Sequence, residues 1–172
     1  MANRLVADDG LVLFSEKLAG SQAFATLFRE GMDLVEETAG YLDGAGRVDA
    51  KSLDRSASLA YATESMRLTT RLMQLASWLL LHRAVKEGEM SLAQANREKV
   101  KVKLTAADPA AKEILDRLPA TLQELIARSM TLQVRIRRLD STMHAPQPLP
   151  ISGNPLVPHL DRLKAAFESP RR

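Results

Sequence analysis

The sequence of 172 residues contains no cysteine, and only 4% of its residues are aromatic. Without cysteine, disulfide scaffolds, zinc–thiolate sites and thiol catalysis are all excluded. The scarcity of Phe, Trp and Tyr argues against a β-sandwich or a barrel, whose strands these residues usually fill. Hydrophobic residues still make up 45% of the chain, which at this length is enough for a folded domain with one core.

A strong charge of one sign and a long hydrophobic run are also missing. Basic residues exceed acidic ones by three, 24 against 21, although the pI is 9.4. This small surplus is not the dense basic patch that binding to a phosphate backbone requires. The longest uncharged and mostly apolar stretch, Leu72–Leu81, is about half as long as a bilayer-spanning helix, and the first residues do not resemble a signal peptide. We therefore expect a soluble cytoplasmic protein that contacts no membrane.

Proline divides the chain into parts. Six of the eight prolines lie in Pro146–Pro170, and none precedes Pro109, so long helices are permitted before that position. The first twenty residues show no sustained period, which is typical of a loosely packed terminus. The expected organisation is a flexible N-terminal segment (1–20), a helical bundle domain (21–144), and a Pro-rich linker with a C-terminal docking peptide (145–172).

Three long helices are predicted from apolar periodicity. The first runs from the N-cap Ser21 to about Tyr41, the second from about Ala50 to Glu87, and the third begins near Pro119. The third has the cleanest stripe, and its flanking arginines are expected to complement the acidic outer face of the first. This stripe consists of Leu118, Leu122, Leu125, Ser129, Leu132, Ile136, Leu139 and Met143, and the flanking arginines are Arg128, Arg135 and Arg138.

The second helix carries two neighbouring apolar stripes, so we expect it to face at least two partners as the middle element. The first stripe consists of Leu59, Ala62, Met66, Thr69, Met73, Ala76 and Leu80, and the second of Tyr61, Ser65, Leu68, Leu72, Leu75 and Leu79. After a stop at Gly88, Leu92–Leu104 is predicted to be helical with Ser91 as its cap, although its end alternates with period two.

Catalytic and ligand-binding motifs are not found. No nucleophile elbow or glycine-rich phosphate loop occurs, and no histidine has an acidic residue three positions before it, as a di-iron bundle requires. We interpret His82 as a surface or interface group at a helix end, and Glu64 as the partner of Arg67 in an intrahelical ion pair. The sequence thus predicts a protein that is not an enzyme and has no metal or cofactor.

Two surfaces are candidates for partner binding. At the apolar end of the second helix lie Trp78, Leu81 and Val85, which either Leu92–Leu104 covers within a monomer or a second chain covers in a dimer. In the C-terminal peptide, four apolar residues recur at helical spacing behind the Pro-rich linker, as in peptides that dock into a groove. These four are Leu156, Leu160, Leu163 and Phe167. The alternative for this peptide is an ordinary disordered terminus.

Several stretches resemble the RcdA family, the regulators of CtrA degradation. The longest is Tyr61–Met90, and shorter ones are Phe28–Met32, Val35–Thr38, Ala93–Lys99 and Gly153–Val157. The resemblance covers about 21–167, and it implies an all-α three-helix bundle that forms a homodimer and has no catalytic activity.

The resemblance also implies a function. Such proteins are similar to adaptors that deliver substrates to the ClpXP protease in bacterial cell-cycle control. The adaptor is expected to dock on ClpX primed by a receiver-domain protein, CpdR, and to tether cargo or a cyclic-di-GMP-binding effector, PopA, that brings CtrA. The C-terminal region is associated with these contacts. The alternative is a basic helical protein associated with nucleic acid, whose binding would weaken steeply with salt.

Overall fold

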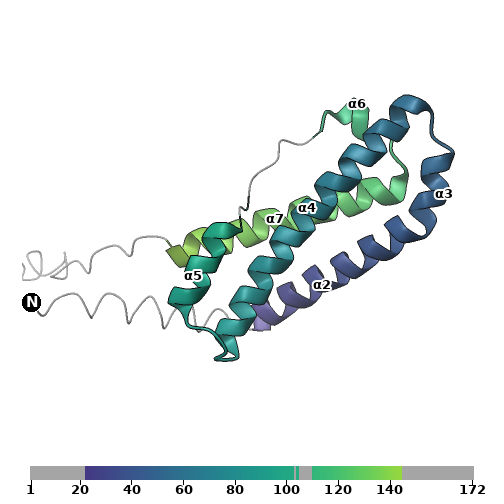
Figure 1. The fold of residues 1–172 in the computed structure, drawn as a ribbon. Coiled ribbons are helices and arrows are strands. Elements are labelled where there is room, and N and C mark those ends of the chain that lie inside the picture. Colours follow the sequence, from purple (N-terminus) through teal and green to yellow (C-terminus); the bar gives the residue numbers. More distant parts are fainter. Residues whose placement is uncertain (1–21, 103, 105–109, 145–172) are drawn as a thin grey trace, which may run out of the picture.

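The structure, a computed structural model, describes residues 22–102, 104 and 110–144, and these residues form six helices and no strand. The predicted all-α fold is therefore confirmed. Three long helices, α2 (Gln22–Asp43), α4 (Arg55–Lys86) and α7 (Ala120–His144), run along the length of the molecule (Figure 1). The short helices are α3 (Ala45–Lys51), α5 (Leu92–Lys101) and α6 (Lys112–Leu115). The predicted segments 1–20 and 145–172 lie outside the described residues.

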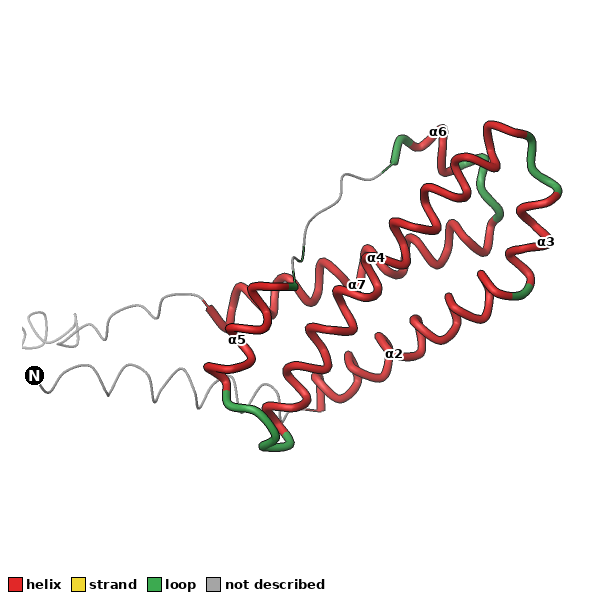
Figure 2. Tube along the Cα trace, viewed as in Figure 1, coloured by secondary structure: helices red, strands yellow, loops and turns green. Residues whose placement is uncertain are grey.

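Contacts between side chains define the direction of each long helix. The Phe24 ring at the start of α2 lies 6.4 Å from the Trp78 ring near the end of α4, while Tyr41 near the end of α2 and Tyr61 near the start of α4 both lie beside Gly46. These two helices therefore run antiparallel. Between α4 and α7, Arg71 is hydrogen-bonded to Ser129, and further along both helices Trp78 is hydrogen-bonded to Asp140. Residue numbers therefore increase in the same direction along the two helices, which run in parallel. A parallel pair needs a return connection, and α5 and α6 lie at opposite ends of α4 along that connection (Figure 2).

The core lies where α2, α4 and α7 meet. The predicted stripe on α7 is confirmed, because all its residues are buried except the half-buried Leu139. From α4, the second predicted stripe supplies the core, including Leu68 and Leu79, which are completely buried. Burying each such leucine contributes roughly 1.5–3 kcal/mol relative to leaving it in water. The apolar stripes are therefore the main force that assembles the bundle.

The boundaries of α4 correct one prediction. Asp54 caps the helix, and its Oδ1 accepts a hydrogen bond from the Ala57 backbone N–H at 2.8 Å. Because this cap starts a new helix, the predicted continuous helix from Ala50 is wrong, and α3 is separate. At its other end α4 stops at Lys86, just before Gly88, as predicted. The φ of Gly88 is 74°, a value that glycine adopts at little cost and other residues rarely do.

The segment after Gly88 is helical, as predicted. Ser91 and Gln94 form a capping box at the start of α5. The alternating residues at the end of the segment continue this helix to Lys101, so their period of two does not produce a strand.

The first predicted stripe of α4 lies on its outer face and is largely exposed. Four of its side chains are half or more exposed: Leu59 (70%), Met66 (72%), Met73 (66%) and Leu80 (51%). The helix does pack against two partners, α2 and α7, but its inner stripe serves both. The prediction that this helix is the middle element with at least two partners is therefore confirmed, although only its inner stripe packs against them.

Candidate partner-binding surfaces

Trp78 lies in the core of the chain. Its side chain is 1% exposed, and its Nε1 donates a hydrogen bond to Asp140 Oδ1 of α7 at 2.9 Å. The same carboxylate forms an ion pair with Lys99 Nζ of α5 at 2.6 Å, so Asp140 connects three helices. Because its ring and its N–H are both satisfied inside the chain, the structure corresponds, for Trp78, to the first of the two predicted alternatives, cover within a monomer.

The neighbours of Trp78 are placed differently. Leu81 and Val85 are half-buried, and they remain a predicted dimer or partner surface. His82 is 3% exposed, and its ring centroid lies 4.1 Å from that of Trp78. It is therefore a core residue and not the surface group that its position near the helix end suggested. The predicted docking residues Leu156, Leu160, Leu163 and Phe167 lie outside the described residues.

A buried polar cluster lies between α4 and α7. Glu64 is 4% exposed and pairs with Arg67 Nη1 at 3.1 Å, which confirms the predicted intrahelical pair. One turn further, Arg71 is 6% exposed and donates from Nη1 to Ser129 Oγ of α7 at 2.8 Å. Ser129 in turn donates to the Ile126 carbonyl at 2.7 Å. The cluster thus places a guanidinium group inside the bundle.

The charge of Arg71 is incompletely compensated. A guanidinium carries five N–H donors, and among the described residues Arg71 forms one hydrogen bond and no ion pair within 4.0 Å. Burial lowers the pKa of Arg71, and the more distant Glu64 opposes this shift. Arg71 was missed from the sequence, although a single arginine between the apolar Leu68 and Leu72 is a recognisable signal.

Arginines on the opposite side of α7 are paired. Arg128 binds Glu37 of α2 at 2.8 Å, and Arg135 binds Glu30 at 2.6 Å. These pairs confirm the predicted complementarity for two of the three flanking arginines. Hydrogen bonding to Arg128 also lowers the pKa of Glu37. Arg71 is therefore unusual in this bundle because it is both buried and without a carboxylate.

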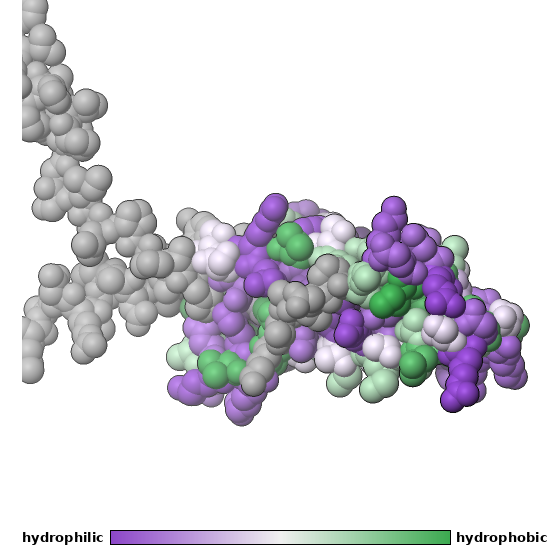
Figure 3. All heavy atoms as spheres, turned by 90° about the horizontal axis from the view of Figure 1, so that it is seen from above, coloured by the Kyte–Doolittle hydropathy of each residue, from purple (hydrophilic) through white to green (hydrophobic). Residues whose placement is uncertain are grey.

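Arg71 opens onto a groove along α4. One cavity of about 480 Å³, toward α7, is lined by Met66, Arg71 and Gln133 among others. A second of about 430 Å³, toward α6, is lined by Leu59 and Ile114 among others. Both are lined by Thr63 and Arg67, so the two cavities adjoin along α4, and together they are called the groove. Seen from the side on which α6 lies, hydrophobic residues reach the surface between hydrophilic ones (Figure 3).

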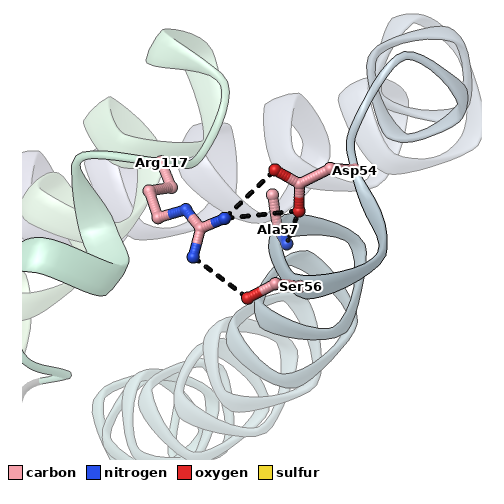
Figure 4. A network of polar contacts seen from close by, with 4 residues as sticks. All are labelled: Asp54, Ser56, Ala57 and Arg117. Carbon is pink, nitrogen blue, oxygen red and sulfur yellow. Dashed lines mark hydrogen bonds and ion pairs between the residues drawn. The ribbon is translucent and has the colours of Figure 1, made fainter.

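Arg117 holds one wall of the groove in place. From the turn between α6 and α7, its Nη2 pairs with Asp54 Oδ2 at 3.1 Å and its Nη1 donates to Ser56 Oγ at 3.0 Å (Figure 4). The Ala57 N–H and the Arg117 guanidinium together lower the pKa of Asp54. These contacts fix α6 against the first turn of α4, where the groove begins.

Metal-binding clusters and membrane-spanning helices are the two other kinds of feature that a helical bundle can carry. Within residues 22–102, 104 and 110–144, no cluster of three or more His, Asp or Glu residues is arranged to hold a metal ion. None of the helices in this part of the chain is long and apolar enough to cross a membrane.

Comparisons with known proteins give the family. A family model described as a protein of unknown function, DUF1465, matches residues 15–167. A crystal structure of RcdA from Caulobacter crescentus CB15 is 54% identical, with a TM-score of 0.60, over 72% of this chain and 92% of that chain. The chain belongs to the RcdA family. RcdA from Caulobacter is thus a solved relative that confirms the resemblance stated above. No curated protein sequence matches the chain significantly.

Proposed function

We propose that this chain is a non-enzymatic adaptor that tethers cargo proteins to the ClpXP protease for regulated proteolysis, including CtrA degradation, in the bacterial cytoplasm. The observation that carries the proposal is the 54% identity to RcdA over 92% of that chain. The proposed activity, delivery of substrates to ClpXP, is the one that the resemblance to the RcdA family implies. The bundle contributes a rigid core, and exposed apolar residues on α4 give it surface for contacts with other proteins.

The proposed mechanism is tethering without bond chemistry. Holding cargo beside the unfoldase raises its effective concentration, to about millimolar for a short flexible connection. In this scheme the bundle binds cargo or a PopA-like cyclic-di-GMP effector, and the tail residues after Ala145 help the chain dock on ClpX primed by CpdR. A homodimer is part of the proposal, with Leu81 and Val85 as candidate contacts.

Binding to ClpX tests the proposal directly. The purified chain is mixed with ClpX in the presence and absence of the receiver-domain protein. Binding that requires the primer is the expected result. If the chain binds in neither state, the adaptor assignment fails, and steeply salt-dependent binding to duplex DNA would favour the alternative of a nucleic-acid-associated protein.

Removal of residues 146–172 tests the role of the tail. The helices should form as in the full chain, because the core lies within α2, α4 and α7, while cargo delivery should be lost. A matched control keeps the full length and replaces Leu156, Leu160, Leu163 and Phe167 with serine. Undiminished delivery by both variants would contradict a docking role for these residues.

A further inference from the structure

The groove carries one positive charge more than the carboxylates that pair with its arginines. Its arginines are Arg67, Arg71 and Arg117, and the carboxylates that pair with them are those of Glu64 and Asp54. Three positive and two negative charges leave a surplus of one, and the unpaired member is Arg71. Glu64 is also the only acidic residue within α4, and it is buried. The exposed face of this helix therefore carries no acidic group that would repel an acidic ligand.

The groove also has an apolar rim of suitable length. Leu59 and Met66 are seven residues apart on α4 and at least 70% exposed, and Ile114 of α6 is 43% exposed on the other side. From Leu59 to Gln74 the groove follows α4 for about 22 Å at 1.5 Å per residue. Between the apolar residues the floor carries small side chains, Thr63 and Thr70. A helix of about four turns fits such a surface.

The burial of Arg71 gives the groove its specificity. A guanidinium group removed from water with one hydrogen bond lowers stability, and a ligand carboxylate that meets its free donors in a bidentate arrangement reduces this cost. Gln133, 7% exposed, lines the same cavity beside Arg71. The side chains that converge there thus match a planar anionic group flanked by apolar surface.

We propose that the groove along α4, between α6 and α7, binds an acidic, apolar helical segment of a partner protein, with one carboxylate of that segment on Arg71. The proposal rests on the proposed function in supposing a protein partner, and it names the chemistry by which that partner is recognised. The carboxylate lies on Arg71, and the apolar side chains of the segment lie on Leu59, Met66 and Ile114.

A displayed library of random 16-residue peptides, selected on the full chain, provides the probe. We expect enrichment of peptides that combine Asp or Glu with Leu, Ile or Met at helical spacing. The most enriched peptide is then synthesised and titrated by fluorescence anisotropy. Because ClpX and CpdR are absent from this assay, its outcome is independent of whether the chain binds the protease. Failure to enrich any peptide, or enrichment without acidic residues, overturns the proposal.

A matched pair of variants at an exposed position locates the site without endangering the fold. Met66 is 72% exposed and lines the same cavity as Arg71, so both Met66→Asp and Met66→Lys should fold. An added negative charge repels an acidic segment, and an added positive charge attracts it. We expect Met66→Asp to bind the peptide about tenfold more weakly than Met66→Lys, at low salt. Equal affinities would overturn the proposal.

Substitution of Arg71 tests the carboxylate contact itself. Arg71→Met should weaken binding of the acidic peptide by roughly 10- to 100-fold, the usual size of a lost charge-assisted hydrogen bond. A version of the peptide with Gln in place of its acidic residues should bind the wild type and Arg71→Met equally. The control is Arg97→Gln on the exposed side of α5, which also removes one positive charge. If Arg97→Gln weakens binding as much as Arg71→Met, the effect is general electrostatics and the proposed site is wrong.

Discussion

Helix α7 packs against α2 on one side and against α4 on the other, and the arginines at the two contacts differ in burial and in pairing. Along α2, Arg128 and Arg135 lie at the exposed edge and each binds a glutamate. Along α4, Arg71 is buried and its one hydrogen bond goes to a neutral serine. Exposed pairs contribute little to stability, whereas a buried charge without a carboxylate lowers it. The buried Arg71 on the α4 side therefore lowers the stability of the fold, and this is also the side that carries the groove.

The largest expected effect comes from opening a cavity at the point where α2, α4 and α7 meet. The Leu79 side chain is completely buried, and a Cβ added at Gly31 of α2 would meet both Leu79 of α4 and Leu132 of α7, so all three helices converge there. Leu79→Ala should lower the free energy of unfolding by about 2–5 kcal/mol, measured by urea denaturation. Leu59→Ala on the exposed face of the same helix is the control. Similar losses in both variants would contradict the assignment of the inner and outer faces.

The hydrogen bond from Trp78 to Asp140 gives the next largest effect. Trp78→Phe keeps an aromatic ring beside His82 but removes the N–H that Asp140 accepts. We expect a loss of about 1.5–3 kcal/mol in unfolding free energy, the usual contribution of a hydrogen bond to a charged group. Sedimentation equilibrium should give the same mass for Trp78→Phe and the wild type. A change in mass without a change in stability would instead restore Trp78 as an interface residue.

The cap of α4 predicts how stability depends on pH. Because the pKa of Asp54 is lowered from its ordinary value of 3.8 in the folded chain, its carboxylate stabilises the fold above that value. This contribution is lost as the pH falls through the lowered pKa. Asp54→Asn keeps a side-chain oxygen for capping but removes the charge. We expect the wild type to be more stable than Asp54→Asn at pH 7 and the difference to shrink as the pH falls below 3.8, measured by urea midpoints. A constant difference across this range would contradict the assignment.

The smallest effect is expected on the α2 side of α7. Arg128→Gln should change the unfolding free energy by at most about 1 kcal/mol, because both members of its pair with Glu37 are about half exposed. The difference from the wild type should decrease further in high salt. A loss of several kcal/mol would mean that the two sides of α7 do not differ as described.

Much of the fold could be predicted from the sequence because apolar periodicity marks which faces of a helix can be buried. The stripe on α7 and the pairing of its arginines with the acidic α2 both followed from spacing. Periodicity does not say which of two apolar faces is covered. For α4 both stripes were read as packing faces, and the one containing Met66 and Met73 lies at the surface.

The candidate site was less predictable because it depends on contacts between distant residues. The sequence left open whether Trp78 is covered within the chain or by a second chain, because the contact that decides it comes from Asp140, 62 positions away. Arg71 was overlooked because its burial arises from packing on Ser129, 58 positions away. The break before α4 was a local signal, the Asp54 cap, and could have been recognised.

The most direct test of the difference between the two sides of α7 is the stability of Arg71→Met, measured by urea denaturation. Methionine fills a similar volume without a charge, Glu64 keeps its pair with Arg67, and Ser129 keeps its bond to the Ile126 carbonyl. We predict that Arg71→Met is as stable as the wild type or up to about 3 kcal/mol more stable. A loss of several kcal/mol would show that Arg71 is a structural residue whose charge is already satisfied, and would contradict the account.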